Sequence, residues 1–407
     1  MNKIFSICTL LSICTLALSP TSAHSATKKW RLEAGIELQA FAEKGFHTDA
    51  RTNASLSVTA EKSHEWNRGD DILYAEFFAR IDEQDDERTH ADIRELSWLH
   101  IEESSDLRIG FSRVFWGVTE SQHLVDIINQ TDLVENPDGE DKLGQPMIQW
   151  TWINDWGILD LHALLGFRER LFPGENGRFR TVYPIDQDKA TFESSAGKQR
   201  LDAAIRFTKT LGSFDIGLSY FSGTDRAPLL LIEDQPSGKV YVPYYPQLEQ
   251  AGVVSQYALG DWLWKLELVS RKSMGDRYTA STFGFEYTQV GVFSSAYDLG
   301  WLVEYSFDDR GTAGPSPFEH DWFMGWRLGF NDADSSEALM GILWDPVSNE
   351  STLSLEASTR LNQDMTIALE LKFFNSDDNV AHASLSDKKL AYLAKDSYAS
   401  LVFNYYF

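Results

Sequence analysis

Alternation of apolar and polar residues with a period of two is the feature that most constrains this chain. From Trp30 to Ala40, apolar residues occupy every even position and polar or small residues occupy the odd ones. A strict period of two over such a span predicts an extended strand with one apolar and one polar face. The same alternation returns in residues 73–81, 201–207, 262–268, 353–358 and 365–373.

The length of these segments favours a membrane protein over a soluble β-sandwich. The longest run nine to eleven residues, the length of a tilted membrane crossing, whereas soluble strands average about five or six. Their polar faces carry both signs of charge, as a water-filled interior tolerates. We therefore expect the apolar faces to contact lipid.

The connections between strands alternate between tight and long. Short turns are predicted at 104–106, 154–157, 211–213, 260–261 and 362–364. Long connections are predicted at 118–146, 169–200, 222–247, 272–281, 308–321 and 375–396. Bacterial outer-membrane barrels have short periplasmic turns and long extracellular loops. The pattern predicts an all-β, antiparallel transmembrane barrel of 16–18 strands, with about eighteen as the best count.

The N-terminus has the layout of an export signal. Lys3 is followed by a mostly apolar run from Ile4 to Leu18, and small residues then lead to a cleavage pattern ending at Ser25. A membrane anchor is the alternative, but the run is short and ends at Ser19-Pro20. We expect a signal peptide at 1–25 and a barrel at 26–407, in the outer membrane of a Gram-negative bacterium after export through the periplasm.

The last residues form the most specific motif. Apolar residues alternate from Ala399 to the terminal Phe407, which resembles the final-strand signal that outer-membrane proteins present to their assembly machinery. The expected partners are therefore that machinery, outer-membrane lipids and lipopolysaccharide. The oligomeric state is left open.

Charge and cysteine content exclude several functions. Both cysteines, Cys8 and Cys14, lie in the signal, so the mature chain has no thiol for a disulfide, a nucleophile or a metal ligand. Removing 1–25 takes away one lysine and no acid, leaving 35 basic and 61 acidic residues and a formal net charge of −26. Such a surface repels nucleic acid and attracts cations. No cofactor and no metal are expected.

A local motif adds a family resemblance. The segment from Phe111 to Gly117, followed by Val125 to Asn129 and by Asp132-Leu133, resembles a family of large, mostly uncharacterised porin-like proteins of Gram-negative bacteria. The resemblance implies a barrel with a pore and a structured loop after a strand that ends in Trp-Gly. It implies no substrate. The alternation begins directly after the signal, which leaves no room for an N-terminal plug domain.

The connection at 118–146 is the best candidate for a pore constriction. Leu124, Ile127, Ile128 and Leu133 could anchor it inside the lumen and leave its carboxylates facing water. An exposed cap without a constriction is the competing interpretation. The acidic stretch at 135–141 could hold Ca²⁺, but it lacks the spacing of a calcium loop and is better interpreted as a solvated turn. The predicted constriction residues are Asp126, Asp132, Glu135, Asp138, Glu140 and Asp141.

Residue parity also predicts a charged lumen wall. Such a wall can select solutes by charge and size, although most of its residues could simply pair across neighbouring strands. The predicted wall residues are Arg31, Arg80, Arg108, Arg168, Arg206, Glu76, Asp160, His162, Glu286, Glu304 and Arg327.

Three functions fit the pattern. A passive channel for small hydrophilic solutes, with a leaning toward cations, is the first, because sixteen or more strands leave an aqueous lumen. An outer-membrane hydrolase is the second, but Asp160-Leu-His162 and His320-Asp321 lack a nucleophile at motif spacing, so we expect no catalytic residue. A plugged structural or secretion-partner barrel is the third.

Overall fold

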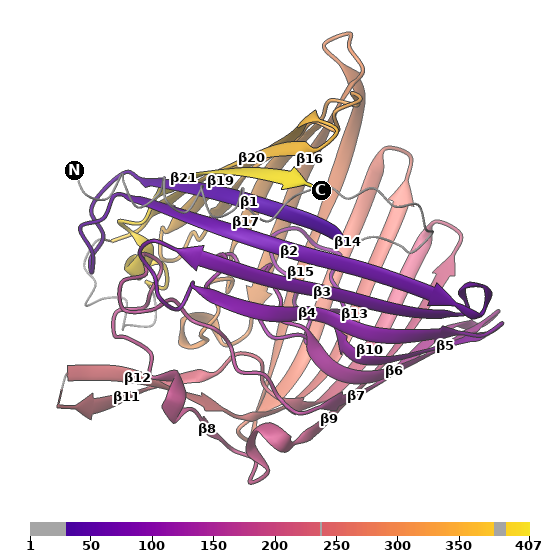
Figure 1. Ribbon diagram of the computed structural model, residues 1–407, viewed down its shortest axis with the longest axis horizontal. Coiled ribbons are helices and arrows are strands. Elements are labelled where there is room, and N and C mark those ends of the chain that lie inside the picture. Colours follow the sequence, from indigo (N-terminus) through magenta and orange to yellow (C-terminus); the bar gives the residue numbers. More distant parts are fainter. Residues whose placement is uncertain (1–29, 237, 378–387) are drawn as a thin grey trace, which may run out of the picture.

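The computed structural model describes residues 30–236, 238–377 and 388–407, so the predicted signal peptide lies outside the described residues. Eighteen strands form one sheet (Figure 1). They are β1 (Arg31–Phe41), β2 (Thr52–Trp66), β3 (Asp71–Asp82), β4 (His90–Ile101), β5 (Ser105–Ser112), β6 (Gln145–Asn154), β7 (Gly157–Leu165), β9 (Leu201–Leu211), β10 (Phe214–Thr224), β13 (Gln247–Leu259), β14 (Trp262–Ser273), β15 (Asp276–Val292), β16 (Tyr297–Asp308), β17 (Trp322–Gly329), β18 (Glu337–Trp344), β19 (Ser351–Asn362), β20 (Met365–Asn375) and β21 (Tyr398–Tyr406).

The sheet closes on itself. Each barrel strand pairs antiparallel with the next along the chain, and β1 pairs with both β2 and β21. Closure removes the open edges that a sheet would otherwise expose to lipid. The predicted fold class and the count of about eighteen strands are thus confirmed, and β21, which contains the C-terminal motif, is the closing strand.

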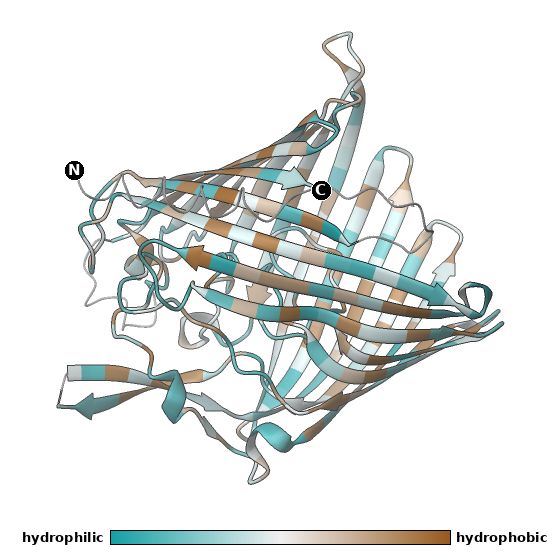
Figure 2. Ribbon diagram, in the orientation of Figure 1, coloured by the Kyte–Doolittle hydropathy of each residue, from teal (hydrophilic) through white to brown (hydrophobic). Residues whose placement is uncertain are grey.

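Alternation along the strands separates an outer apolar face from an inner polar one. In β1, Ile36 and Leu38 expose 40% and 48% of their surface, whereas Glu37 and Gln39 expose 8% and 7%. Figure 2 shows hydrophilic and hydrophobic residues alternating along the wall. The apolar face therefore points outward and the lumen is polar, as the period of two predicts.

The two rims differ in their connections. The rim that holds both ends of the barrel, where Glu33 lies opposite Tyr406, has short turns, and we call it the terminal rim. Its connections are 67–70, 102–104, 155–156, 212–213, 260–261, 293–296, 330–336 and 363–364. The opposite rim, the loop rim, has the connections 42–51, 83–89, 113–144, 166–200, 225–246, 274–275, 309–321, 345–350 and 376–397.

The long connection expected at 272–281 is wrong. Only Met274 and Gly275 join β14 to β15, and Lys272 lies opposite Arg277. The φ angles are 53° at Met274 and 92° at Gly275, the left-handed pair that a two-residue hairpin between twisted strands requires. The charged residues suggested a loop because the ladder continues beyond the apolar band, where polar side chains cost nothing.

A small second sheet lies at the loop rim. It consists of β8 (Thr191–Phe192), β11 (Leu229–Gln235) and β12 (Gly238–Tyr245). Figure 1 shows the β11–β12 hairpin standing away from the barrel wall. Short 3₁₀ helices complete the described part of the chain: η1 (Asn67–Gly69), η2 (Gln187–Lys189), η3 (Gly197–Gln199), η4 (Gly311–Ala313) and η6 (Ala391–Leu393). Among the described residues, no helix has the length and apolar character of a membrane span.

Candidate pore and its inner loop

The connection at 113–144 folds into the barrel, and we call it the inner loop. It leaves the wall at β5 and returns at β6, yet it bonds to β14, β16, β17 and β20. In a ring of eighteen strands these lie across from β5 and β6, so the loop must cross the lumen. Of the two interpretations left open by the sequence, the structure has the inward-folded one. The loop is shifted from the expected 118–146 because β6 begins at Gln145.

One end of the inner loop is held by a buried carboxylate of β14. Glu267 is fully buried, at 0% exposure. Its Oε1 accepts the backbone N–H groups of Val118 (2.7 Å) and Thr119 (3.1 Å), and its Oε2 accepts that of Val125 (3.1 Å). Hydrogen bonds to an ionised acceptor are about twice as strong as neutral ones. Glu267 therefore fixes the backbone of the loop against the wall.

A second carboxylate, on β16, repeats this arrangement. Glu304 Oε1 accepts the backbone N–H of Glu120 at 2.8 Å, and Oε2 accepts that of Ser121 at 2.8 Å. The side chain of Glu120 in turn pairs with Arg327 of β17 at 2.6 Å. Together with Glu267, these contacts tie the consecutive loop residues 119–121 to the three strands β14, β16 and β17.

Apolar side chains also pack the inner loop against the barrel wall. Val125, Ile127 and Ile128 expose 1%, 4% and 0% of their surface. They form one cluster with Trp116 and with wall residues that include Met147. Leu124 belongs to this cluster as expected, but the expected anchor Leu133 does not. Filling the lumen with close-packed side chains makes this part of the loop a rigid partition.

Titratable groups concentrate in the loop. Burial raises the pKa of Asp126 to about 6, against the opposing charges of Lys142 and His123. His123 lies 3.3 Å from Glu140, and although burial lowers the pKa of His123, the bond and charge of Glu140 leave it raised overall. A Cβ at Gly117 would come within 2.5 Å of His123 Nδ1, so only glycine fits beside this imidazole.

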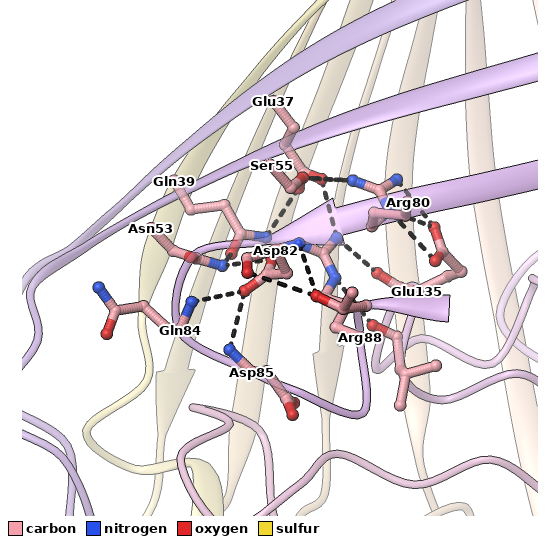
Figure 3. Close-up of polar contacts among 12 residues, drawn as sticks. Glu37, Gln39, Asn53, Ser55, Arg80, Asp82, Gln84, Asp85, Arg88 and Glu135 are labelled. Carbon is pink, nitrogen blue, oxygen red and sulfur yellow. Dashed lines mark hydrogen bonds and ion pairs between the residues drawn. The ribbon is translucent and has the colours of Figure 1, made fainter. Parts of the chain in front are cut away.

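A polar network connects the loop to β1 and β3 (Figure 3). The Arg80 guanidinium lies 2.6 Å from Glu37 Oε2 and 2.8 Å from Glu135 Oε2. Arg88, from the turn after β3, lies 2.8 Å from the same Glu37 oxygen and 3.0 Å from Asp82. Because all five side chains are largely buried, each charge depends on its partners. The network therefore holds the inner loop against β1 and β3.

One group within the described residues has the spacing of metal ligands, namely His90, Asp132 and Glu135. His90 Nε2 lies 3.7 Å from Asp132 and 3.5 Å from Glu135. Each carboxylate already has a guanidinium at 2.8 Å, Arg94 on Asp132 and Arg80 on Glu135. A metal ion would have to compete with both arginines, so we assign the group to the ion-pair network.

Six other predicted wall residues lie on barrel strands, where they contact the inner loop or neighbouring strands. Glu76 pairs with Arg113 of the inner loop at 2.5 Å, and Glu286 lies between Lys265 and Arg327. Trp116 of the inner loop contacts the His162 ring and the Arg206 guanidinium. Asp160 accepts the hydroxyl of its neighbour Thr151, and Arg108 lies on β5 opposite Gln149.

Two predicted wall residues lie elsewhere. Arg168 follows the end of β7 and pairs with Asp92 at 2.5 Å, so it belongs to a loop-rim connection. Arg31 lies at the terminal rim with its side chain 66% exposed, beside Glu61. Parity cannot place either residue, since one lies outside a strand and the other lies where the lumen opens into water.

Residues from connections were missed because they obey no alternation. Arg88 closes the network described above, and Arg178 ties three loop-rim connections together. The Arg178 guanidinium lies 2.7 Å from Asp396 and donates to the carbonyls of Glu43 and Ala50. Neither residue carries a sequence signal, because both act through contacts between distant loops.

The space left beside the inner loop is acidic. A cavity of about 600 Å³, which we call the inner chamber, lies between the loop and strands β1–β3 and β17–β21. Its lining includes nine carboxylates (Glu33, Glu37, Glu120, Glu135, Asp138, Asp141, Glu337, Glu356 and Glu370) and three arginines (Arg80, Arg88 and Arg327). Each arginine is ion-paired to a carboxylate, so the chamber keeps an excess of negative charge.

The predicted constriction residues divide between the chamber and the loop's own interior. Glu135, Asp138 and Asp141 line the chamber, whereas the side chains of Asp126 and Asp132 are only 2% and 0% exposed. Lys372 lies 3.6 Å from Asp138. Asp141 is exposed toward the chamber, but its enclosure within the barrel and the nearby charges of Asp138 and Glu135 raise its pKa to about 7.

Comparison with known proteins identifies the fold. No family model and no curated protein matches the chain. Wzi, an outer-membrane carbohydrate-binding β-barrel involved in group 1 capsule assembly in Escherichia coli, superimposes with a TM-score of 0.53 at 10% identity, covering 93% of this chain and 84% of Wzi. OmpT of Vibrio cholerae gives 0.45 at 8% identity over 94% and 99% of the two chains. A mutant Rh. blastica porin gives 0.42 at 10% identity over 93% and 99%.

At these identities the likeness concerns the fold alone. The closed ring of eighteen strands and the match to Wzi agree with the architecture expected from the sequence. The chain has the fold of a large, closed antiparallel β-barrel of the kind that Wzi shows.

Proposed function

We propose that this barrel is a channel that lets small hydrophilic solutes diffuse across the outer membrane and that prefers cations. The acidic inner chamber carries the proposal. Its volume of about 600 Å³ exceeds what a single ion needs, and nine carboxylates against three paired arginines give it a negative potential. A low-dielectric wall around such a lumen concentrates cations and repels anions.

The cell-level setting belongs to the same proposal. The chain is exported through the periplasm, its loop rim faces outward and its terminal rim faces the periplasm. The assembly machinery would bind β21 with its terminal Phe407, and lipids and lipopolysaccharide would surround the wall. No catalytic role is proposed, since His162 packs against Trp116 and His320 contacts Tyr305 at 3.2 Å, which are structural positions.

Planar-bilayer recording of the purified, refolded chain tests the channel. A tenfold KCl gradient should give stepwise currents whose reversal potential is displaced toward the K⁺ equilibrium potential. A variant with residues 118–142 replaced by a short glycine–serine linker should conduct more and discriminate less, because the partition is gone. The proposal would be contradicted if neither protein gave channel currents, or if the reversal potential were displaced toward the Cl⁻ equilibrium potential.

A filled, ligand-binding barrel is the second candidate. The close-packed cluster around Ile128 and Val125 occupies part of the lumen, and the Wzi fold is that of a carbohydrate-binding barrel. This candidate predicts saturable binding of an oligosaccharide by a protein that forms no channels, even after removal of the inner loop.

A further inference from the structure

A second cavity lies at the loop rim, where five connections meet. It measures about 250 Å³, and we call it the vestibule. Ten of its twelve lining residues are apolar or aromatic, among them Phe172, Phe179, Leu230 and Tyr392. An open aqueous channel mouth would carry mostly polar groups. This composition instead resembles a pocket that holds the apolar part of a ligand.

The vestibule and the inner chamber are separated by one stretch of the inner loop. Within residues 133–141, Leu133 and Pro137 line the vestibule, whereas Glu135 and Asp138 line the chamber. Pro137 and Asp138 are consecutive, and consecutive Cα atoms are about 3.8 Å apart. An apolar pocket and an acidic one are therefore only the thickness of a chain apart.

Both ends of this separating stretch are clamped to the wall. Arg80 holds Glu135, and Arg88 donates to the Glu135 carbonyl at 3.1 Å. On the far side, Asn136 donates to Glu370 at 3.4 Å, and Lys372 lies 3.6 Å from Asp138. The order of the two environments along the lumen is thus fixed by the fold.

We propose that the solutes this channel selects are organic amines with an apolar body, such as an aromatic ring on a short alkylammonium chain. The ring binds in the vestibule, and the negative potential of the chamber attracts the ammonium from the other side of the separating stretch. This inference rests on the proposed channel function and names its substrate class. A cavity of about 150 Å³ holds benzene, so the vestibule has room for a ring with its linker.

Arg170 is the charged residue of the vestibule and must be weighed against this assignment. Its Nε donates to Gln130 at 3.3 Å, and its backbone N–H donates to the hydroxyl of Tyr245 at 3.1 Å. Asp225 acts on the guanidinium with opposite charge. An apolar carboxylate could bind this arginine, but it would then meet the excess negative charge of the chamber, which favours the amine.

Three probes that differ in the ring and in the sign of the charge separate these chemistries. Phenethylammonium, ethylammonium and phenylacetate are added in turn to the loop-rim side of the full-length protein in planar bilayers while the K⁺ current is recorded. We expect phenethylammonium to reduce the current at a concentration about tenfold below that of ethylammonium, since a buried ring contributes at least that much. Phenylacetate should have no effect.

Matched variants locate the ring. Leu230→Ser should remove most of the tenfold difference and leave the KCl conductance unchanged, as should Ile185→Ser from a different connection. Leu231→Ser is the control, because Leu231 is 47% exposed and does not line the vestibule. Equal potency of the two amines, or stronger action of phenylacetate, would overturn the inference while the channel itself stands.

A protein without K⁺ current fails the proposed function instead. Calorimetric titration of phenethylammonium into the detergent-solubilised protein then decides the inference separately. Saturable binding that Leu230→Ser abolishes would support the vestibule site, and the absence of saturable binding would overturn it.

Discussion

Ser121 donates both its backbone N–H (2.8 Å) and its hydroxyl (2.7 Å) to the same carboxylate oxygen of Glu304. Ser121 belongs to the inner loop, which leaves the wall at β5, whereas Glu304 lies on β16 across the ring and is only 2% exposed. A wall carboxylate that accepts loop N–H groups does for the inner loop what a capping residue does for a helix end. It satisfies backbone donors that the loop cannot satisfy itself.

Glu304→Gln should loosen the inner loop. A glutamine has one carbonyl oxygen, so one of the N–H groups now bound by Glu304 would face the amide NH₂, at a cost of about 1–3 kcal/mol. We expect frequent brief changes of single-channel current and faster proteolysis of the loop. Glu233→Gln, on the exposed face of β11, should leave both unchanged. Steady currents in Glu304→Gln would show that the other contacts of the loop hold it without Glu304.

Charge reversal in the inner chamber should weaken the cation preference. Glu356 lines the chamber on β19, and Glu356→Lys replaces attraction by repulsion for a passing cation. A charge about 4 Å away in water is worth about 1 kcal/mol, or roughly fivefold, and the substitution reverses the sign of that interaction, so the K⁺/Cl⁻ permeability ratio should fall by at least that factor. The reversal potential measures this ratio, with Glu233→Lys as the control. An unchanged ratio would place the ion path outside the chamber.

The wall could be predicted from the sequence because each strand obeys one physical rule. Ile36 must face lipid, so Glu37 must face the lumen, and this parity also places Glu267 and Glu304 correctly. The rule extends to weakly patterned segments, since 55–62 lies within the full-length strand β2. It fails at Lys272, where a strand continues into water.

Connections obey no such rule, which is why parts of the site were missed. Arg88 and Arg178 act through loops more than forty residues away in sequence, and only tertiary packing brings them there. For the same reason, the sequence did not decide whether the inner loop folds into the lumen. Its apolar residues predict burial, but they do not say whether burial occurs in the lumen or within a cap.

Lowering the pH should reduce cation preference near neutrality. Enclosure within the barrel and neighbouring carboxylates raise the pKa of Asp141 to about 7, and burial raises that of Asp126 to about 6. Both groups are ionised above these values and become neutral as the pH falls through them. The reversal potential should therefore shift between about pH 8 and pH 5, far above the ordinary range of aspartate.

Asp141→Asn should remove the upper part of this shift, because Asp141 faces the chamber. The same substitution should also stabilise the barrel at pH 8, where the raised pKa means that ionised Asp141 opposes folding, and should have little effect at pH 4. Asp86→Asn, in the exposed turn after β3, is the control. A pH response that survives in Asp141→Asn would assign it to other carboxylates.

Arg80 and Glu135 should behave as one energetic unit. Arg80→Gln leaves Glu135 and Glu37 with less countercharge in a site where the side chains are only 6% and 10% exposed. Breaking a buried pair in this way costs about 3–5 kcal/mol. Glu135→Gln should cost a similar amount, and the double variant should cost clearly less than the two together, since no charge is then stranded between these partners. Urea unfolding of the refolded barrel measures each difference.

The exposed pair Arg31 and Glu61, changed in the same way, should give no more than about 1 kcal/mol in total. Strict additivity at Arg80 and Glu135 would mean that water enters the network and screens the pair.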